Sequence, residues 1–189
     1  MALAVLTCLY ERPMHPYEVS QTLRTRAKDE SIRLNFGSLY SVVESLEKRG
    51  FVVATETVRE GKRPERTIYA ITDAGKRELV DWLSELVAVP VKEYLSFEAA
   101  LSLLPALGPE DAQELLAARC VALEVRLAKS KATRSNAVTM GLPRLFMLED
   151  EYRERLIEAE LDFTQSLLKE IEGRSLEGIE EWAGFHKTD

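Results

Sequence analysis

The sequence contains few of the residues that metal centres, disulfide frameworks and hydrolytic sites require. Its 189 residues include two cysteines and two histidines, and His15 and His186 lie near opposite ends of the chain. HExxH, GxSxG and glycine-rich phosphate-binding patterns are all missing. We therefore expect no catalytic residues, no metal site, no cofactor and no enzymatic activity.

Long apolar runs and a secretory leader are also missing. No segment approaches the roughly 20 apolar residues that a membrane helix requires. The first residues, MALAVLTCLYERP, have neither a basic leader nor a small-residue cleavage site. Cys8 and Cys120 lie within apolar helical patterns, so two buried thiols are a simpler interpretation than a disulfide. The sequence thus predicts a cytoplasmic protein.

An overall excess of positive charge is absent, but the charge is unevenly distributed. The formal net charge of −7 and a pI near 5.1 argue against a protein that coats nucleic acid indiscriminately. Residues 1–90 hold 13 Lys+Arg against 13 Asp+Glu, and residues 91–189 hold 12 against 19. Within 24–66 the count is 10 basic to 7 acidic. An overall acidic protein can therefore still present one basic face, formed within residues 24–66.

The first 50 residues predict three helices. Segment 2–10 is continuously apolar and short enough for a buried helix, and Pro16 suits the first turn of a second helix, where its missing N–H costs nothing. Apolar residues at helical spacing over 35–50 predict a third helix. We expect Ser38 at its N-cap and Gly50 just beyond its end.

A β-hairpin and a fourth helix follow. β-Branched and aromatic residues predict strands near 52–58 and 66–71, with turn residues between them. Thr72 is expected to cap a helix that runs to about residue 87. Three helices followed by a hairpin is the order of a winged helix-turn-helix. We therefore predict a mainly α (α+β winged-helix) fold class, with a DNA-binding domain over 1–88.

Residues 89–189 are expected to form an all-helical C-terminal domain. The pattern predicts a short apolar helix over 94–104 and a longer one from Pro109 to about Arg134. Residues 135–143 are expected to form the turn to a third helix over 144–172.

The predicted 144–172 helix carries an apolar seam with steps of three and four residues. Such a seam is long for packing within a small domain, and a two-fold dimer would bury it. A self-contained helical subdomain is the alternative. The acidic run at 149–155 is expected to be a solvated helix face. The candidate dimerisation residues are Leu115, Leu123, Leu127, Leu148, Tyr152, Leu156, Phe163 and Leu167.

The outer face of the predicted third helix carries Tyr40, serines and a late lysine where surface helices usually carry salt-bridge ladders. Small hydroxyls let a helix approach base edges, and Tyr40 can reach a phosphate or a base. A basic hairpin turn would grip the DNA backbone in a salt-sensitive manner. A solvated helix and a soluble hairpin tip are the alternatives. The candidate DNA-binding residues from this pattern are Asn35, Tyr40, Ser41, Ser45, Lys48, Arg59, Lys62, Arg63 and Arg66.

Three segments resemble successive blocks of the PadR family of bacterial transcriptional regulators: ERPMHPYEV, FGSLYSVVESLEKRGFV and RTIYAITDAGKRELVDWL. The resemblance covers roughly residues 2–87 and is strongest in GSLYxxxxxLEKxG and YxxTxxGxxxLxxWL. The helical remainder is similar, more loosely, to the C-terminal domain of the longer members. This chain has Pro16 where the family usually has Gly, and Ser41 where it usually has Pro. These departures concern the operator sequence more than the fold.

The resemblance implies a homodimeric regulator, usually a repressor, that binds an inverted-repeat operator in double-stranded DNA. Family members often release DNA when a small aromatic or drug-like molecule binds. In some members a tryptophan on the fourth helix stacks on flat ligands, so Trp82 is the candidate effector residue, with ordinary core packing as the alternative. The DNA-facing positions that match the family are His15, Tyr17, Ser38, Tyr40 and Ser41.

Two other functions remain open. The first is a transcriptional activator of the same architecture, which the sequence does not distinguish from a repressor. The second is a winged-helix protein-interaction module without DNA binding, and the basic balance of 24–66 argues against it.

Overall fold

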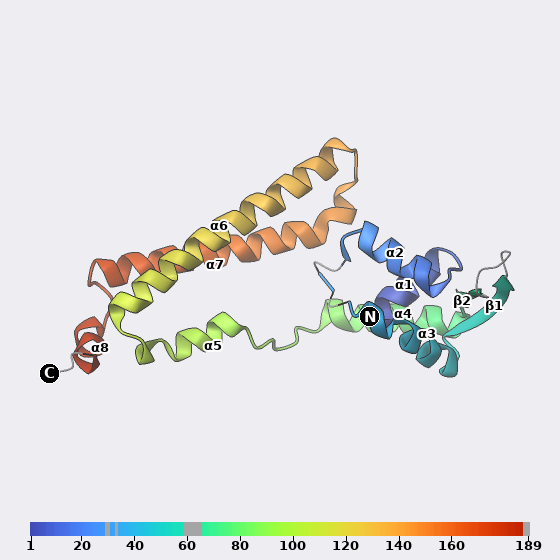
Figure 1. The fold of residues 1–189 in the computed structure, drawn as a ribbon, viewed down its shortest axis with the longest axis horizontal. Coiled ribbons are helices and arrows are strands. Elements are labelled where there is room, and N and C mark those ends of the chain that lie inside the picture. Colours follow the sequence, from blue (N-terminus) through green and yellow to red (C-terminus); the bar gives the residue numbers. More distant parts are fainter. Residues whose placement is uncertain (29–30, 33, 59–65, 187–189) are drawn as a thin grey trace. The chain divides into compact units, whose positions relative to one another are not determined.

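The structure is a computed structural model that describes all residues except 29–30, 33, 59–65 and 187–189. The chain forms two compact units, Met1–Lys92 and Glu93–Asp189 (Figure 1). It is mainly helical with one two-stranded sheet, which confirms the predicted fold class. Among the described residues, no helix has the length and apolarity needed to cross a membrane.

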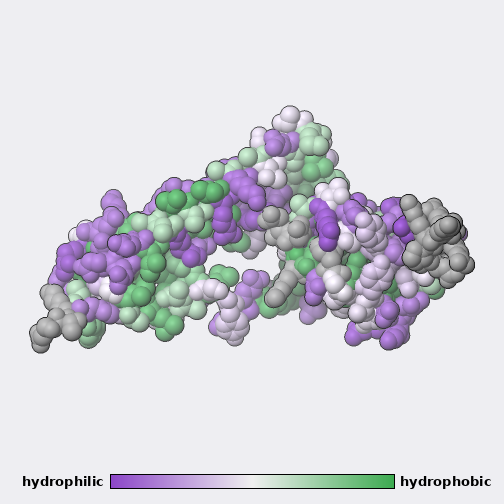
Figure 2. All heavy atoms as spheres, viewed as in Figure 1, coloured by the Kyte–Doolittle hydropathy of each residue, from purple (hydrophilic) through white to green (hydrophobic). Residues whose placement is uncertain are grey.

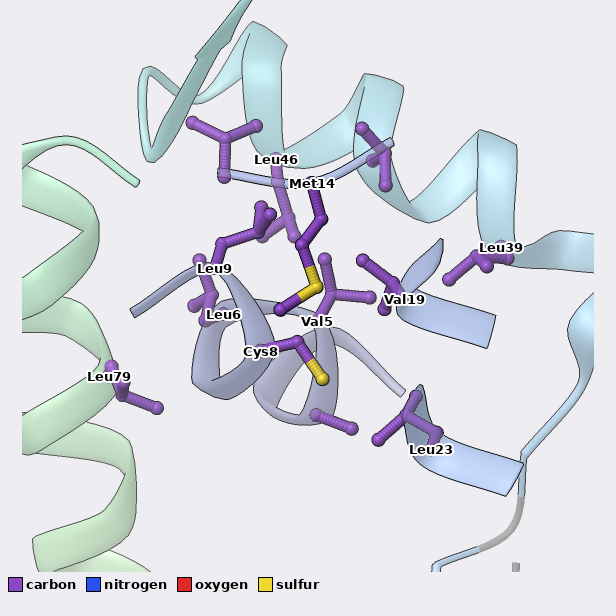
Figure 3. Packing of buried hydrophobic residues seen from close by; sticks show 13 residues of the cluster. Val5, Leu6, Cys8, Leu9, Met14, Val19, Leu23, Leu39, Leu46 and Leu79 are labelled. Atoms are coloured by element: carbon purple, nitrogen blue, oxygen red, sulfur yellow. The ribbon is translucent and has the colours of Figure 1, made fainter. Parts of the chain in front are cut away.

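Unit 1 is built on a single apolar core. Its thirteen buried residues come mainly from the first three helices, and Figure 3 shows them pointing toward one another around Met14. The bounds of the helices are α1 Ala2–Glu11, α2 Pro16–Thr25, α3 Leu39–Lys48, after the 3-10 turn η2 Phe36–Ser38, and α4 Asp73–Ala88. Cys8 is a buried free thiol in this core, and Cys120 is another in unit 2, as predicted.

The end of α3 is fixed by a glycine turn. Gly50 has a φ of +75°, a conformation that costs a residue without Cβ little. The Gly50 N–H donates to Glu47 O at 2.8 Å, and the Phe51 N–H donates to Leu46 O at 2.9 Å. This is the paired bonding of a Schellman cap, and it confirms the predicted role of Gly50.

The wing is an antiparallel hairpin of β1 Val52–Val58 and β2 Arg66–Ile71, which confirms the predicted strands. The register pairs Val52 with Ile71 and shifts between Ala54 and Glu56, as at a β-bulge. The chain before α2 joins this sheet: Met14 N–H donates to Tyr69 O, and Tyr69 N–H donates to Met14 O, each at 3.0 Å. The wing is therefore tied to the start of α2.

Thr72 joins the wing to α4. Its hydroxyl accepts from the Gly75 N–H at 3.0 Å, so it caps α4 as predicted, and it donates to Gly50 O at 2.7 Å. The first turn of α4 thereby lies against the turn that ends α3. A Cβ added at Gly75 would lie 2.0 Å from Phe51 O, so only glycine fits there.

Unit 2 contains a long helical hairpin with smaller elements at one end. The bounds are α5 Ser96–Ser102, η3 Leu104–Ala106, α6 Pro109–Thr139, η4 Arg144–Met147, α7 Leu148–Glu172 and α8 Ile179–Phe185. The prediction that 135–143 forms the turn is wrong in its first half, because α6 continues to Thr139. Hydroxyls in this stretch bond back to the helix, with Thr139 Oγ1 donating to Ser135 O at 3.0 Å.

The prediction that 149–155 forms a solvated acidic face is also wrong in part. Glu154 is only 4% exposed, and its carboxylate accepts from Arg134 Nε at 2.9 and 3.0 Å. The buried face of α7 consists of Glu154, Ile157, Thr164 and Ile171. An ion pair between α6 and α7 satisfies the buried carboxylate, as a charge removed from water requires.

The predicted apolar seam lies on a different side of α7. Four of its members, Leu148, Tyr152, Leu156 and Phe163, are between 45% and 66% exposed within one chain, and we call them the α7 stripe. Figure 2 shows apolar residues reaching the surface along this hairpin. Of the other candidate dimerisation residues, Leu115 is exposed, Leu127 and Leu167 are half-buried, and Leu123 is buried.

Helix α8 closes unit 2. Ala112, Leu116, Ile171, Ile179 and Trp182 form a buried cluster that joins α6, α7 and α8. The indole Nε1–H of Trp182 donates to Leu107 O at 2.7 Å. The end of the described chain is thus fixed to the segment that precedes α6.

Candidate nucleic-acid interface

Helix α2 begins with a histidine cap. His15 Nδ1 accepts from the Tyr17 N–H at 3.1 Å, and Glu18 Oε2 accepts from the His15 N–H at 2.9 Å. Pro16 occupies the first turn, as predicted. This reciprocal capping box holds the imidazole in a defined position at the start of the helix.

The same histidine reaches α3. The rings of His15 and Tyr40 have centroids 6.1 Å apart at an interplanar angle of 70°, an edge-to-face arrangement. Tyr17 and Tyr40 are both exposed, and the Tyr17 hydroxyl accepts from Gln21 Nε2 at 2.7 Å. The starts of α2 and α3 therefore present two tyrosines and a histidine together.

The turn before α3 uses two of the predicted site residues for its own bonding. Asn35 Oδ1 accepts from the Gly37 N–H at 3.1 Å, and Ser38 Oγ donates to Asn35 O at 2.9 Å. Ser38 does lie at the N-cap position, but its side chain makes no capping bond to α3. These contacts fix where α3 starts.

The two faces of α3 differ sharply. Leu39, Val43 and Leu46 are buried in the core of unit 1. The other face exposes a hydroxyl-rich surface with Lys48 at its end and two carboxylates, Glu44 and Glu47. The exposed candidates on this face are Tyr40, Ser41, Ser45 and Lys48. Apart from the edge contact between His15 and Tyr40, these side chains remain exposed in the described part of unit 1, so the face is accessible to a partner.

Within the described part of the wing, Arg66 supplies a positive charge near this face. Arg66 is exposed at the start of β2. Its charge acts on His15: the pKa of His15 lies below its ordinary value, first because burial disfavours the charged ring and second because of Arg66, while Glu18 opposes the shift. The wing candidates Arg59, Lys62 and Arg63 lie outside the described residues.

The lowered pKa of His15 predicts a pH-dependent stability. The folded state needs an unprotonated Nδ1 to accept the Tyr17 N–H, so the unfolded chain binds the proton more readily. The stabilisation that the unprotonated His15 cap adds to the folded state is complete above about pH 6.5, the ordinary histidine pKa. It is lost as the pH falls through the lower pKa of the folded state. We expect the free energy of unfolding to decrease accordingly, by less than the ~1 kcal/mol of a whole N-cap.

The measurement is urea unfolding between about pH 5 and pH 7.5, in the wild type and in His15→Asn. Asparagine keeps a capping acceptor but does not titrate, so the variant should lose this part of the pH dependence. If the free energy of unfolding depended on pH equally in the two proteins, His15 would not be the group responsible. With only two histidines in the chain, the His15 ring signals can also be titrated directly by NMR.

Sequence reasoning missed the residues that hold this surface in place. Glu18 was not singled out, although a carboxylate three residues after a capping residue is a recognised helix-start pattern. The pairing of Met14 with Tyr69 had no local signal, because it joins segments distant in the sequence. Both contacts position His15 and the wing without presenting a side chain to a partner.

The candidate effector residue lies beside the same core. Trp82 is half-buried and packs against the core of unit 1, close to the buried Leu79. Leu83 and Leu86, which follow it on α4, are exposed. Core packing thus accounts for part of the indole surface.

Known proteins are similar to this chain in sequence. Residues 5–81 match the family model described as the transcriptional regulator PadR-like family. The probable transcriptional regulator Rv1176c of Mycobacterium tuberculosis is 31% identical over 86 residues, 43% of this chain. The matched segment spans 42% of that regulator's own length.

Solved structures are similar in fold over most of both units. Bacillus subtilis PadR in complex with operator DNA has a TM-score of 0.76 at 18% identity, covering 90% of this chain and 98% of that one. The same protein with p-coumaric acid has a TM-score of 0.73 at 18% identity, covering 90% and 97%. The Vibrio cholerae virulence activator AphA has a TM-score of 0.70 at 18% identity, covering 92% and 99%. At these identities the likeness establishes the fold.

Proposed function

We propose that this chain, whose residues 5–81 match the PadR-like family of transcriptional regulators, is a cytoplasmic, dimeric repressor of an inverted-repeat operator. One observation carries the proposal. The open face of α3 combines hydroxyls with the His15–Tyr40 ring pair, and the wing is bonded to the start of α2 beside it. The operator complex of Bacillus subtilis PadR, a fold relative, supports DNA as the partner.

We assign α3 to the major groove and the wing to the flanking backbone. The small side chains of Ser41 and Ser45 allow α3 to approach base edges, and Tyr40 and Lys48 extend far enough to contact bases or phosphates. Tyr17 lies at the start of α2, where helix-turn-helix proteins contact the backbone. The capping box holds the start of α2, and with it Tyr17, in place before DNA binds. This order limits the conformational entropy lost on binding.

The α7 stripe supports a homodimer. Exposed apolar residues at steps of four and seven are expensive to leave in water, and a second copy of the same stripe would bury them around a two-fold axis. Such a dimer presents two copies of α3 to two half-sites about one turn of DNA apart. An effector that alters the helical hairpin would alter that spacing, and with it the affinity for DNA.

The first experiment is a mobility-shift titration on DNA from immediately upstream of the protein's own gene, comparing the wild type with a variant in which Arg63 and Arg66 are alanine. Each lost phosphate contact removes one released counterion, so the slope of log K against log salt should become shallower by about two. We also expect affinity near physiological salt to fall by about tenfold or more.

The matched control is a variant with Lys169 and Arg174 replaced by alanine, which removes the same charge from unit 2. It should keep the wild-type salt slope. If the wild type fails to bind any DNA even at low salt, the groove-reading proposal is wrong and an interaction module becomes the better explanation. Equal slopes for both double variants would remove the wing from the interface.

A further inference from the structure

Two carboxylates lie on the exposed side of α3, the helix that we assign to the major groove. Glu44 and Glu47 are both exposed. A carboxylate accepts hydrogen bonds but donates none, so neither group can bond to a phosphate oxygen, and each repels the duplex. The two residues differ in where they stand on the helix, and that difference gives Glu44 a separate role.

Helical geometry places Glu44 on the part of α3 that faces away from the core. At about 100° per residue, the direction opposite to the buried residues of α3 runs between Ser41 and Lys48. Glu44 lies within about 50° of that direction, and Glu47 lies about 100° from it. Glu44 therefore belongs to the middle of the exposed face, and Glu47 belongs to its edge.

The electrostatics of the wing agree with this placement. Tyr69 lies on β2, and its pKa is raised, first by burial and then by the charges of Glu47 and Glu44, in that order. The larger of the two charge effects comes from Glu47, so Glu47 is the carboxylate nearer to the wing. Glu44 is left as the carboxylate that a partner on the open face would meet.

The described part of the chain supplies no cation to Glu44. Neither Glu44 nor Lys48 takes part in an ion pair there, although a lysine four residues after a glutamate is well spaced for one. On α4, by contrast, Lys76 pairs with Asp73 at 3.0 Å. The Glu44 carboxylate is therefore solvated in the free protein and needs a donor in any complex that removes its water.

The neighbours of Glu44 allow it to reach the edges of bases. Ser41 lies three residues before it and Ser45 directly after it, and these short side chains let the helix come close to the floor of the groove. At that approach the two methylene groups of glutamate extend its carboxylate to the base edges.

The major groove offers a carboxylate two kinds of donor, the N4 amino group of cytosine and the N6 amino group of adenine. In adenine the neighbouring N7 is an acceptor, and its lone pair repels a carboxylate. In cytosine the neighbouring ring carbon carries only a hydrogen atom. Guanine and thymine present acceptors to the groove. Among the four bases, cytosine is thus the one that matches a carboxylate.

We propose that Glu44 sets the specificity of α3 by accepting a hydrogen bond from the N4 amino group of a cytosine in each half-site. The inference rests on the proposed function, because it requires α3 in the major groove. The same carboxylate weakens binding to all other DNA, where no amino group offsets its repulsion from the phosphates. Glu44 thus raises the ratio of specific to non-specific affinity, which decides how a genome is occupied.

The test is selection from duplex DNA randomised over about 30 base pairs, enough for two half-sites one turn apart, with the full-length wild type and two variants. The wild type should enrich a cytosine at one position of each half-site. Glu44→Gln should enrich adenine there, because an amide donates to N7 and accepts from N6. Glu47→Gln removes the same charge from the same helix and is the matched control, so it should enrich the wild-type site.

Mobility shifts measure two opposite effects on affinity. On the wild-type site, Glu44→Gln should bind at least about fivefold more weakly, the usual cost of a mismatched base pair. On unrelated duplex DNA it should bind about twofold more tightly at low salt, since a repulsive charge has been removed. Glu47→Gln should weaken binding to neither DNA. Tighter binding of Glu44→Gln to both DNAs would reduce Glu44 to a repulsive charge and overturn the proposal.

The selection separates this inference from the proposed function. Loss of discrimination at the cytosine alone in Glu44→Ala supports the proposal, and a change at a position that is not cytosine in the wild-type site would overturn it. If both Glu44 variants select the wild-type base at every position, the role of Glu44 is wrong and the proposed function stands. If the folded wild type enriches no sequence, groove reading is wrong and the inference fails with it. Circular dichroism checks that each variant is folded, as expected for exchanges on an exposed helix face among good helix formers.

Discussion

Replacing Gly75 with alanine is expected to destabilise unit 1 by about 3 kcal/mol or more, the upper range for forcing one extra carbon into a packed site. The added Cβ would lie 2.0 Å from Phe51 O and 2.9 Å from Ile71 Cγ1. Phe51 O is backbone, so the clash is relieved only if α4 moves away from the end of α3. That movement also strains the Thr72 bonds that join the wing to both helices.

Far-UV circular dichroism in urea measures the effect, with Gly184→Ala as the control. Gly184 lies within α8, and a Cβ there would meet nothing within 4 Å. Alanine at a helical position of this kind is neutral or slightly stabilising. A domain holds about 5–15 kcal/mol in total, so the Gly75 variant should unfold at visibly lower denaturant. A loss below about 1 kcal/mol would contradict the close packing of α4 against the α3 turn.

Replacing Tyr152 and Leu156 with glutamate is expected to separate the proposed dimer and to lower operator affinity about a hundredfold or more. Both residues lie in the middle of the α7 stripe, and a two-fold axis would bring four new carboxylates together in an apolar contact. A monomer binds a single half-site and loses the effective concentration that the second one provides, which is worth about 10²–10⁴ in avidity.

Analytical ultracentrifugation gives the mass, and the mobility shift gives the affinity. Val121→Glu is the matched comparison, because Val121 is an apolar residue 61% exposed on α6 rather than on the stripe. It should stay dimeric. Dissociation by Val121→Glu but not by the α7 double variant would move the interface to the outer face of α6.

The features that the sequence predicted well depend on neighbouring residues. Thr72 and Gly50 were identified from local chemistry, since an N-cap hydroxyl and a left-handed glycine each act within a few residues. The predicted strands agree with the structure for the same reason, because runs of β-branched residues lie on both sides of a stretch of turn residues. Within the site, the exposed face of α3 followed from helical periodicity alone.

The features that it predicted poorly depend on tertiary contacts. Serine, asparagine and threonine after Arg134 indicated a turn, but α6 continues to Thr139, whose hydroxyl donates to Ser135 O, and α7 packs along α6. Periodicity identified the α7 stripe without revealing that Ile157 lies on a second, inward face of α7. The buried Glu154 was invisible because its partner, Arg134, lies on another helix.

The bond from Trp182 to Leu107 has a consequence for synthesis on the ribosome. All parts of unit 1 are available once Lys92 has emerged, so it can fold while the rest of the chain is still being made. Unit 2 must wait, because the cluster that closes it requires Ile179 and Trp182. Each nascent chain can therefore complete unit 1, the proposed DNA reader, well before unit 2, and the proposed pairing between two copies would follow translation of α8.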